Sequence, residues 1–414
     1  MSFNPFQEQG IPIEQQFRSW SDLNVKPYAR EDVHPYSRCR GIVMNGIETE
    51  AILFSHQMAR HTLDQSLKRQ LALVRRAESQ QQKAVNWLIP GDESTLEVTL
   101  GYEQVAVDLT AWVARNEPDP YLRQVYEFGL LEDFDHLYRY ANLLHLTDGK
   151  AAERITGPYT EIMPGRPTIF EHRHPHDEIR RPMTIEAADP QSALNALTIM
   201  ASEQQTMNWY NNIGNRFQEP LARGLYLEIA EIEEQHVSHY ESIMDPSTTW
   251  FAQLVLHEYN ECWLYYSFMQ DESDPRVRAL YELHLAMEVE HLRIAAELLQ
   301  TYDKRDATEL LPATFPATVT FEPNKEYVRG LLAAQTDLTA DGENFVDVSR
   351  LPPDHRFFRY QQIVNRGGAP SEQVIAEAQA GAGEYRLATE GPHPHPALRR
   401  QGSEQRLHYE TAAE

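Results

Sequence analysis

Four stretches between residues 203 and 291 combine carboxylates and imidazoles at helical spacing. Glu233-Glu-Gln-His236 and Glu288-Val-Glu-His291 each place an acid three residues before a histidine, and single acids stand at Glu203 and Glu258. Residues i and i+3 share one face of a helix, so each pair presents two ligands on the same side. Two such helices, with one glutamate from each of two others, bring four carboxylates and two imidazoles into a bundle core. The pattern predicts a site for two metal ions.

The charges of these groups favour metal over any other partner. Four buried carboxylates are neutralised by two divalent cations, whereas each unpaired carboxylate would cost several kcal/mol. Oxygen and imidazole ligands without a thiolate suit iron or manganese, so we expect two Fe ions, with a mixed Mn/Fe pair as the alternative. The two cysteines, Cys39 and Cys262, form no Cys-x-x-Cys pair, which excludes a cysteine-ligated zinc finger or a rubredoxin-type iron site.

The predicted site needs helices, and apolar residues recur at helical spacing through most of the first 302 residues. Residues 149–190 contain six prolines and are predicted to be a long connection. After Asp303 the pattern weakens to a short strand-like run, 317–321, one or two short helices and a polar tail. The fold class predicted from this pattern is mostly α. Helical stretches are expected at 46–89, from about 92 to 115, at 120–146, and at about 191–213, 219–244, 249–271 and 275–302.

An internal repeat organises these stretches. Shifting the chain by 155 residues superposes 35–147 on 190–302 without a gap, so that Asp119-Pro120 falls on Asp274-Pro275 and His136 on His291. Matched prolines, histidines and carboxylates at one constant offset indicate a tandem duplication of a four-helix unit. The predicted domains are an N-terminal extension (1–34), a bundle with an altered site (35–148), a proline-rich connection (149–189), a bundle with a complete di-metal site (190–302) and a C-terminal extension (303–414).

The motif of the second copy resembles the ferritin-like di-iron carboxylate superfamily, most nearly its rubrerythrin-like branch. Tyr210 lies seven residues after Glu203, as a tyrosine does on the first helix of rubrerythrins. The resemblance covers 190–302 and, through the repeat, 35–147. It implies two tandem ferritin-like four-helix bundles, followed by an irregular C-terminal region that has no counterpart in rubrerythrins. The four-cysteine rubredoxin domain of rubrerythrins is absent here, so the resemblance does not extend to their electron route.

Several residues beside the motif are further candidates. His284 stands four before Glu288 on the same face, similar to an extra fourth-helix histidine of arylamine N-oxygenases, and is either an additional metal ligand or a packed edge residue. Glu261 resembles the extra third-helix glutamate of rubrerythrins, and a solvated acid is the alternative. Tyr210, His239 and Tyr240 are candidates for groups that contact the ligands from behind, with ordinary packing as the alternative for the last two.

The first copy keeps the pattern in altered form. Four carboxylates remain, while a glutamine replaces one histidine, an aspartate replaces one glutamate, and Gly129 stands in place of His284. A lost imidazole weakens a metal site, yet buried acids without a metal are costly to retain. The first copy is therefore predicted to be either a degenerate metal site or a protonated, hydrogen-bonded cluster. The candidate residues of this second site are Glu48, Glu78, Gln81, Glu103, Asp133 and His136.

Composition bounds the function. The chain has 414 residues with 37 Lys+Arg against 62 Asp+Glu, a net charge of −25, which argues against a nucleic-acid or anionic-membrane binder. No run of about 18 apolar residues and no signal peptide is evident, so a cytoplasmic location is expected. Two histidine-rich tracts, 171–177 and 392–396, are predicted to be polar loops.

The resemblance implies a di-iron oxidase or oxygenase that uses O2 to oxidise a small organic substrate. Residues 149–190 and 303–414 would enclose the substrate pocket over the second bundle. The alternative is a ferroxidase or a rubrerythrin-like protein that scavenges peroxide, and a second alternative is a non-catalytic ferritin-like scaffold. The expected partners are O2 or peroxide and a small-molecule substrate, with the electron donor unidentified and an oligomer left open.

Overall fold

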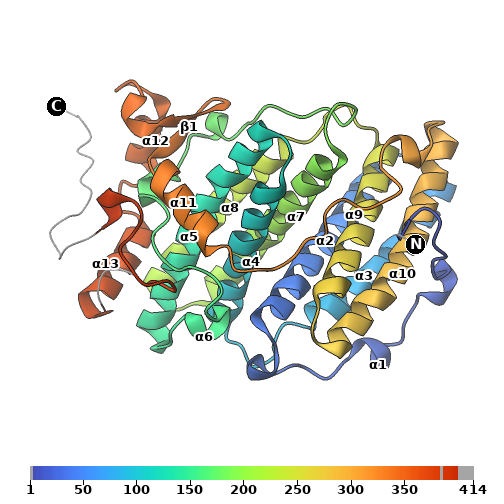
Figure 1. The fold of residues 1–414 in the computed structure, drawn as a ribbon, viewed down its shortest axis with the longest axis horizontal. Coiled ribbons are helices and arrows are strands. Elements are labelled where there is room, and N and C mark those ends of the chain that lie inside the picture. Colours follow the sequence, from blue (N-terminus) through green and yellow to red (C-terminus); the bar gives the residue numbers. More distant parts are fainter. Residues whose placement is uncertain (1–2, 383–385, 400–414) are drawn as a thin grey trace.

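Eight long helices dominate the computed structural model, which describes residues 3–382 and 386–399 (Figure 1). The prediction of a mostly α fold is confirmed. The long helices are α2 (Pro35–Arg60), α3 (Gln65–Asn86), α4 (Thr95–Asn116), α5 (Pro120–Asp148), α7 (Pro190–Ile213), α8 (Pro220–Glu241), α9 (Trp250–Asp271) and α10 (Pro275–Tyr302). Two short helices, α1 (Trp20–Leu23) and α6 (Glu153–Thr156), lie in the N-terminal extension and the proline-rich connection.

The long helices begin at local signals in the sequence. Five of them start with proline: α2, α5, α7, α8 and α10. At the first position of a helix the missing backbone N–H of proline costs nothing. Acidic or hydroxyl side chains cap α3, α4 and α9, with Ser94 and Glu97 forming a reciprocal capping box. The starts fall at 35, 65, 95 and 120 and again at 190, 220, 250 and 275, so the 155-residue offset of the sequence extends to every start of a long helix.

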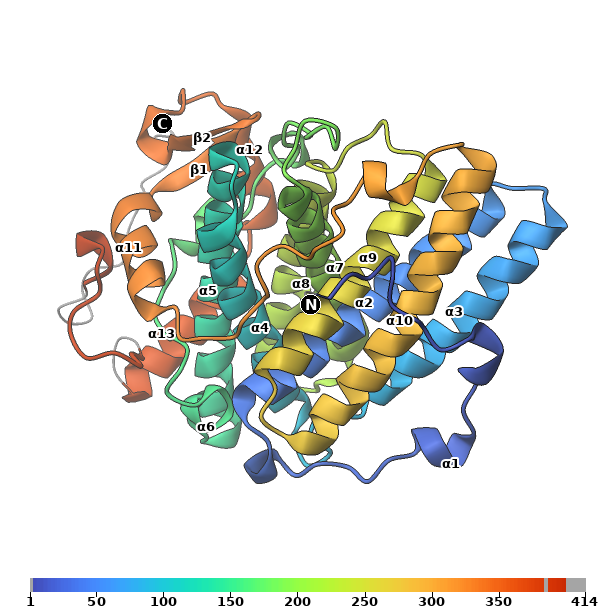
Figure 2. The ribbon, with the colours of Figure 1, turned by 45° about the vertical axis from the view of Figure 1, so that its right-hand side comes forward.

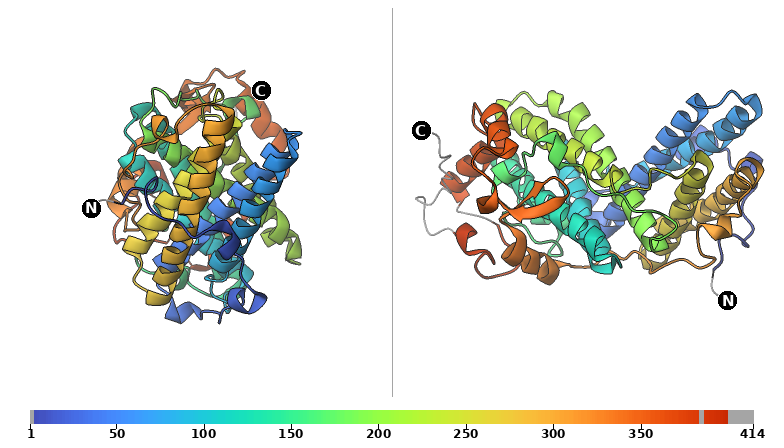
Figure 3. Two further views of the ribbon diagram at one scale, coloured as in Figure 1. Left: turned by 90° about the vertical axis from the view of Figure 1, so that its right-hand side faces the viewer. Right: turned by 90° about the horizontal axis from the view of Figure 1, so that it is seen from above.

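The helices pair in a different way from the expected bundles, in which each repeat forms its own. α4 and α5 pack with α7 and α8, and α2 and α3 pack with α9 and α10. The first set is a continuous segment, 95–241, and the second joins residues near both ends of the helical region. In Figures 1 and 3 the blue helices α2 and α3 accordingly lie on the same side of the molecule as α9 and α10, and α2 also packs on α4 and α7 of the first set. We call 95–241 the inner group and the other four helices the outer group.

Reciprocal hydrogen bonds between the two repeats stabilise this pairing of helices. Ser37 of α2 donates to Glu272 at the end of α9 (2.7 Å), and its counterpart Ser192 of α7 donates to Glu117 at the end of α4. Glu272 also pairs with Arg40 of α2. Each two-helix hairpin has one apolar face to bury, and these buried contacts direct it to the hairpin of the other repeat.

The C-terminal region covers the inner group. Helices α11 (Lys325–Gln335) and α13 (Pro370–Ala382) pack on α5, and α13 also packs on α8, as Figure 2 shows. The hairpin of β1 (Leu338–Asp341) and β2 (Asn344–Asp347) and helix α12 (Arg356–Val364) lie at the same end. The strand-like run 317–321 is irregular, because the chain there crosses the helices and gives the Ala317 carbonyl to the Trp263 indole N–H.

In the part of the chain that the structure describes, no helix combines the length and apolarity required to cross a membrane.

Candidate metal centres

Two buried clusters of acids and histidines lie in the cores of the two helix groups. Centre I, in the outer group, contains Glu48, Glu78, Glu258, Glu261, Glu288 and His291, and centre II, in the inner group, contains Glu103, Asp133, His136, Glu203, Glu233 and His236. Ligand atoms within each subgroup of three or four residues lie within 4.8 Å of one another.

Because each helix group contains one two-helix hairpin from each repeat, the predicted ligands of each repeat are divided between the two centres. The six residues expected to form one complete site are divided, with Glu203, Glu233 and His236 in centre II, and the remaining three, Glu258, Glu288 and His291, in centre I. The six residues expected to form the altered site are divided in the same way. The physical reason is that the faces of α7 and α8 that carry the acids meet the acid-bearing faces of α4 and α5. Each centre therefore draws on both repeats.

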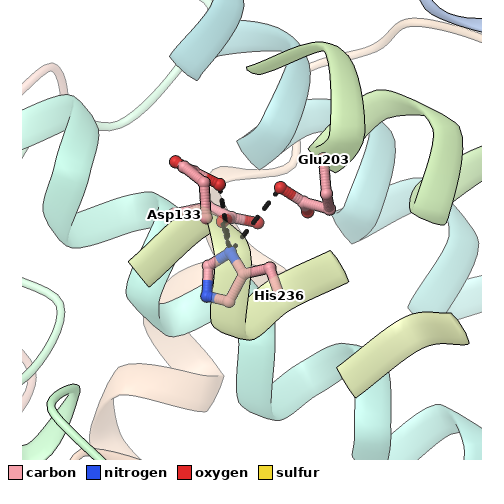
Figure 4. Close-up of side chains that lie close together, drawn as sticks. Asp133, Glu203 and His236 are labelled. Atoms are coloured by element: carbon pink, nitrogen blue, oxygen red, sulfur yellow. Dashed lines mark ion pairs between the residues drawn. The ribbon is translucent and has the colours of Figure 1, made fainter. Parts of the chain in front are cut away.

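Centre II gathers one acid from each of four helices around two histidines. His236 Nδ1 on α8 lies 3.1 Å from Asp133 Oδ1, 3.3 Å from Glu233 Oε2 and 3.6 Å from Glu203 Oε2, and Figure 4 shows the first and last of these contacts. His136 Nδ1 on α5 lies 3.0 Å from Glu233 Oε1. Both histidines thus aim the same ring nitrogen at the carboxylates.

Burial and crowding perturb the acids of centre II. All six residues are almost fully buried. Burial raises the pKa of Glu103 and of Glu233 well above the ordinary range, and burial together with the charge of Glu203 raises the pKa of Asp133 to about 6. Burial alone would lower the pKa of His236, but the Asp133 carboxylate raises it well above its ordinary value. The cluster as a whole has four carboxyl groups and two imidazoles, an excess of acids over bases.

A cation fits this excess. Both oxygens of Asp133, one oxygen each of Glu203 and Glu233, and His236 Nδ1 are buried without a hydrogen-bond partner among the described residues. Buried acceptors left without a donor cost about 1–3 kcal/mol each, more when charged. Four carboxylates and two imidazoles are the donor set of a di-metal carboxylate site, and this set is completed only by combining both repeats.

A second layer of carboxylates stands behind the two histidines. His236 Nε2 lies 2.9 Å from Glu132 Oε2, and His136 Nε2 lies 3.4 Å from Glu171 Oε2. Arg166 and Arg173 pair with Glu132, and Arg139 pairs with Glu171. A carboxylate on the far ring nitrogen fixes the orientation and raises the basicity of a ligating histidine.

Sequence reasoning missed this second layer. Glu171 and Arg173 belong to the histidine-rich tract in the proline-rich connection, which was expected to be a polar loop, yet both are buried against centre II. The other tract, 392–396, also has partners, since His393 Nε2 lies 2.7 Å from the Pro164 carbonyl. Glu132 immediately precedes Asp133, and that acidic neighbour of a candidate ligand was the one available signal.

The three candidates for groups behind the ligands lie at different places around centre II. Tyr210 of α7 donates its hydroxyl hydrogen to Glu103 of α4. The Tyr240 ring approaches that of His236 at 6.4 Å, and its hydroxyl occupies the space that a side chain at Gly129 would fill. His239 turns away from the cluster, with Nε2 3.3 Å from the Val125 carbonyl.

Centre I has one histidine. His291 Nδ1 lies 3.0 Å from Glu288 Oε2 and 3.8 Å from Glu258 Oε2, and its Nε2 lies 2.7 Å from Gln16 Oε1 of the N-terminal extension. Gln81 of α3 stands where a second histidine would be and donates to Glu288 Oε1. A neutral amide thus replaces an imidazole on one side of centre I.

Of the two additional candidates, Glu261 lies within centre I and His284 lies beside it. Glu261 forms a subgroup with Glu48 and Glu288. His284 stands one contact further away, with Nδ1 2.9 Å from the hydroxyl of Tyr265, which donates to Glu48. His284 therefore reaches the acids of centre I through Tyr265.

The acids of centre I also lack donors. Burial raises the pKa of Glu48, Glu258 and Glu261 well above the ordinary range, and that of Glu78 to about 7. Both oxygens of Glu261 and one oxygen of each of the other three are buried without a hydrogen-bond partner in the described part of the chain. A cation fits here by the same reasoning as at centre II.

A narrow cavity of about 10 Å3 reaches centre I, with Glu78, Glu258 and His291 among its lining residues and apolar side chains such as Leu71 and Leu254 around it. A cavity of this volume has room for about one water molecule.

Comparison of the chain with protein-family models, with curated proteins and with solved structures found no match.

Proposed function

We propose that this chain is a ferritin-like di-metal carboxylate protein, formed by tandem duplication, whose two centres hold iron or manganese and react with O2 or peroxide. The observation that carries the proposal is centre II, where two acid-x-x-His helices and two further acids converge in a buried core. Both histidines of this centre have a carboxylate behind the ring nitrogen that faces away from the cluster.

The chain's own residues would divide the work at centre II. His136 and His236 would each bind metal through Nδ1, and the four carboxylates would supply the oxygen ligands. Glu132 and Glu171 would hold the rings in place, and Tyr210 would fix Glu103 through its hydroxyl. A reduced iron pair, when bound, supplies the electrons that reduce O2 or peroxide. The surrounding buried side chains would exclude bulk water.

Two versions of this chemistry differ in what is oxidised. In the first, an O2-dependent oxidase or oxygenase acts on a small organic molecule; in the second, iron or peroxide is itself the substrate. The narrow cavity at centre I favours the second version for that centre, because about 10 Å3 admits a water-sized molecule and not an organic ring.

The test is metal stoichiometry after anaerobic Fe(II) loading of the full chain. We expect about four irons per chain in the wild type, and about two after either His236→Ala or His291→Ala, because the two histidines serve different centres. Consumption of O2 or H2O2 by the loaded protein, with and without organic additives, then separates the two versions. Failure of the wild type to bind iron or manganese would contradict the proposal and leave a non-catalytic scaffold.

A further inference from the structure

A pocket lies apart from both metal centres, at the junction of the two helix groups. It has a volume of about 570 Å3 and is lined by residues of α2 and α3 from the outer group and of α4 and α7 from the inner group. Junctions of this kind and this size are common places for small-molecule sites. Among the residues that the structure describes, no charged side chain and no member of centre I or II lines this pocket. By contrast, 24% of the residues of the whole chain are charged.

A chain of hydrogen-bonded side-chain amides on one wall of the pocket determines which of their polar atoms face the pocket. Gln205 Nε2 donates to the backbone carbonyl of Ile42 (2.8 Å), which can only accept, so Gln205 Oε1 must face the other way. That oxygen accepts from Asn45 Nδ2 (2.8 Å), and Asn45 Oδ1 accepts from Gln82 Nε2 (2.6 Å) and from Asn86 Nδ2 (3.1 Å). The branch that lines the pocket therefore ends at Asn86 Oδ1, an acceptor that no described donor occupies.

The wall formed by α7 has the same character. Asn208 Nδ2 and Asn212 Nδ2 donate to the backbone carbonyls of Gln204 and Asn208, at 2.9 and 2.7 Å. Both side-chain oxygens are therefore left as acceptors, and no donor in the described part of the chain meets them. Asparagine is a poor helix former, so amides in the last turns of α7 are not explained by helix stability.

Aromatic rings supply the remaining recognition surface. Tyr102 of α4 and Trp209 of α7 stack with their ring centres 5.5 Å apart and their planes 10° apart. The Trp209 indole N–H donates to Thr99 (3.2 Å), which holds the ring in place and uses its hydrogen-bond donor. Trp87 also lines the pocket. The faces of such rings attract cations.

We propose that this pocket binds an organic ammonium ion. An ammonium group brings N–H donors to the amide oxygens and positive charge to the ring faces, and the net charge of −25 raises its concentration near the protein. A sugar of similar size would find few donors for its own oxygens. The proposal does not depend on the metal centres, because none of their residues lines the pocket.

The repeat provides an internal control. At the 155-residue offset, Glu50 and Glu241 correspond to Gln205 and Asn86, and a stacked pair, Phe54 and His257, corresponds to Trp209 and Tyr102, with ring centres 4.4 Å apart. The counterpart face thus keeps the stacked rings but has acids in place of Gln205 and Asn86. Phe54→Leu is therefore a matched control for Trp209→Leu.

The test is calorimetric titration of the full chain at pH 7 with cyclohexylammonium chloride and with cyclohexanol, its neutral analogue. We expect one ammonium ion per chain, bound at least about tenfold more tightly than the alcohol. Trp209→Leu and the exposed variant Asn212→Ala should each weaken the binding of the ammonium ion by about tenfold, and Phe54→Leu should leave it unchanged.

Three results would overturn the proposal. Equal binding of cyclohexanol would mean that the pocket recognises the ring and not the charge. Ammonium binding that is unaffected by both Trp209→Leu and Asn212→Ala would place the ion on the acidic surface instead. Absence of cyclohexylammonium binding would exclude the proposed ligand class. Each outcome is independent of whether the two centres bind iron.

Discussion

His236 Nε2 on α8 lies 2.9 Å from Glu132 Oε2 on α5, while Nδ1 of the same ring faces the acids of centre II. Glu132 directly precedes Asp133, so one helix supplies both a candidate ligand and the group that orients the opposing histidine. Although Glu132 is buried, Arg173 and His236 hold its pKa below its ordinary range. A permanent negative charge therefore stands behind His236.

Neutralising that charge is expected to weaken centre II. In Glu132→Gln the ring loses its anionic partner, and the affinity for Co(II) or Fe(II) at centre II should fall by about 10–100-fold. Metal titration followed by absorption spectroscopy measures this. At centre I the corresponding residue is Met287, so Met287→Leu should leave metal affinity unchanged. Equal affinities of Glu132→Gln and wild type would show that the contact does not support metal binding.

The exchange of hairpins predicts which residues are coupled energetically. Glu103 and His236 belong to different repeats but to one centre, whereas Glu103 and His291 belong to different centres. In double-mutant cycles of Co(II) binding, Glu103→Gln and His236→Ala should couple by about 0.5–3 kcal/mol, and Glu103→Gln and His291→Ala should be additive. Coupling with His291 and none with His236 would contradict the helix pairing.

Gly129 is expected to tolerate no side chain. A Cβ at this position of α5 would overlap the hydroxyl of Tyr240 on α8. Gly129→Ala should therefore lower the free energy of unfolding by about 1–3 kcal/mol, as overpacking does. Adding Tyr240→Phe, which removes the hydroxyl, should restore most of the loss. Chemical denaturation of the two single variants and the double variant decides this, and equal losses with and without Tyr240→Phe would rule out the overlap.

A buried acid outside both centres predicts a pH dependence of stability. Burial raises the pKa of Asp108 to about 7, although Thr160 donates a hydrogen bond to it (2.6 Å). The unfolded chain releases this proton near pH 3.9, so the folded state binds more protons between about pH 4 and 7, and the free energy of unfolding falls as pH rises through that window.

Asp108→Asn keeps the acceptor for Thr160 and removes the titration. The variant should exceed the wild type in free energy of unfolding at pH 8, by about 1–3 kcal/mol, and the difference should shrink as pH falls towards 4. Denaturation of the metal-free proteins in chelator at both pH values measures this. A difference that does not depend on pH would refute the shifted pKa.

The sequence predicted the helices well because their signals are local. The caps at Asp119 and Asp274 and the prolines at helix starts act within a single helical turn. The 155-residue offset then repeats these signals along the chain. Eleven of the twelve cluster residues belong to the two predicted ligand sets, and the twelfth is the additional candidate Glu261. The remaining predicted residue, Gln81, lies beside centre I.

The partner of each hairpin could not be predicted in this way. An apolar face indicates that a hairpin must be buried but not which other hairpin covers it. The hairpins of the two repeats have similar apolar faces, so the sequence does not distinguish them. The decisive contacts, Ser37 with Glu272 and Ser192 with Glu117, join residues 235 and 75 positions apart. The buried role of Glu171 was hidden for a related reason, since its partners His136 and Arg139 lie on a helix that ends before the connection begins.

The nesting of one helix group within the other also sets an order of assembly. The inner group, 95–241, closes over short separations and is complete in a growing chain before the outer group has its second half. Helices α2 and α3, made first, must wait for α9 and α10 before Glu48 and Glu78 meet their neighbours in centre I. Domains generally fold as units during synthesis, and in this chain the acids of the first hairpin lack their centre I partners until nearly three hundred residues have been made.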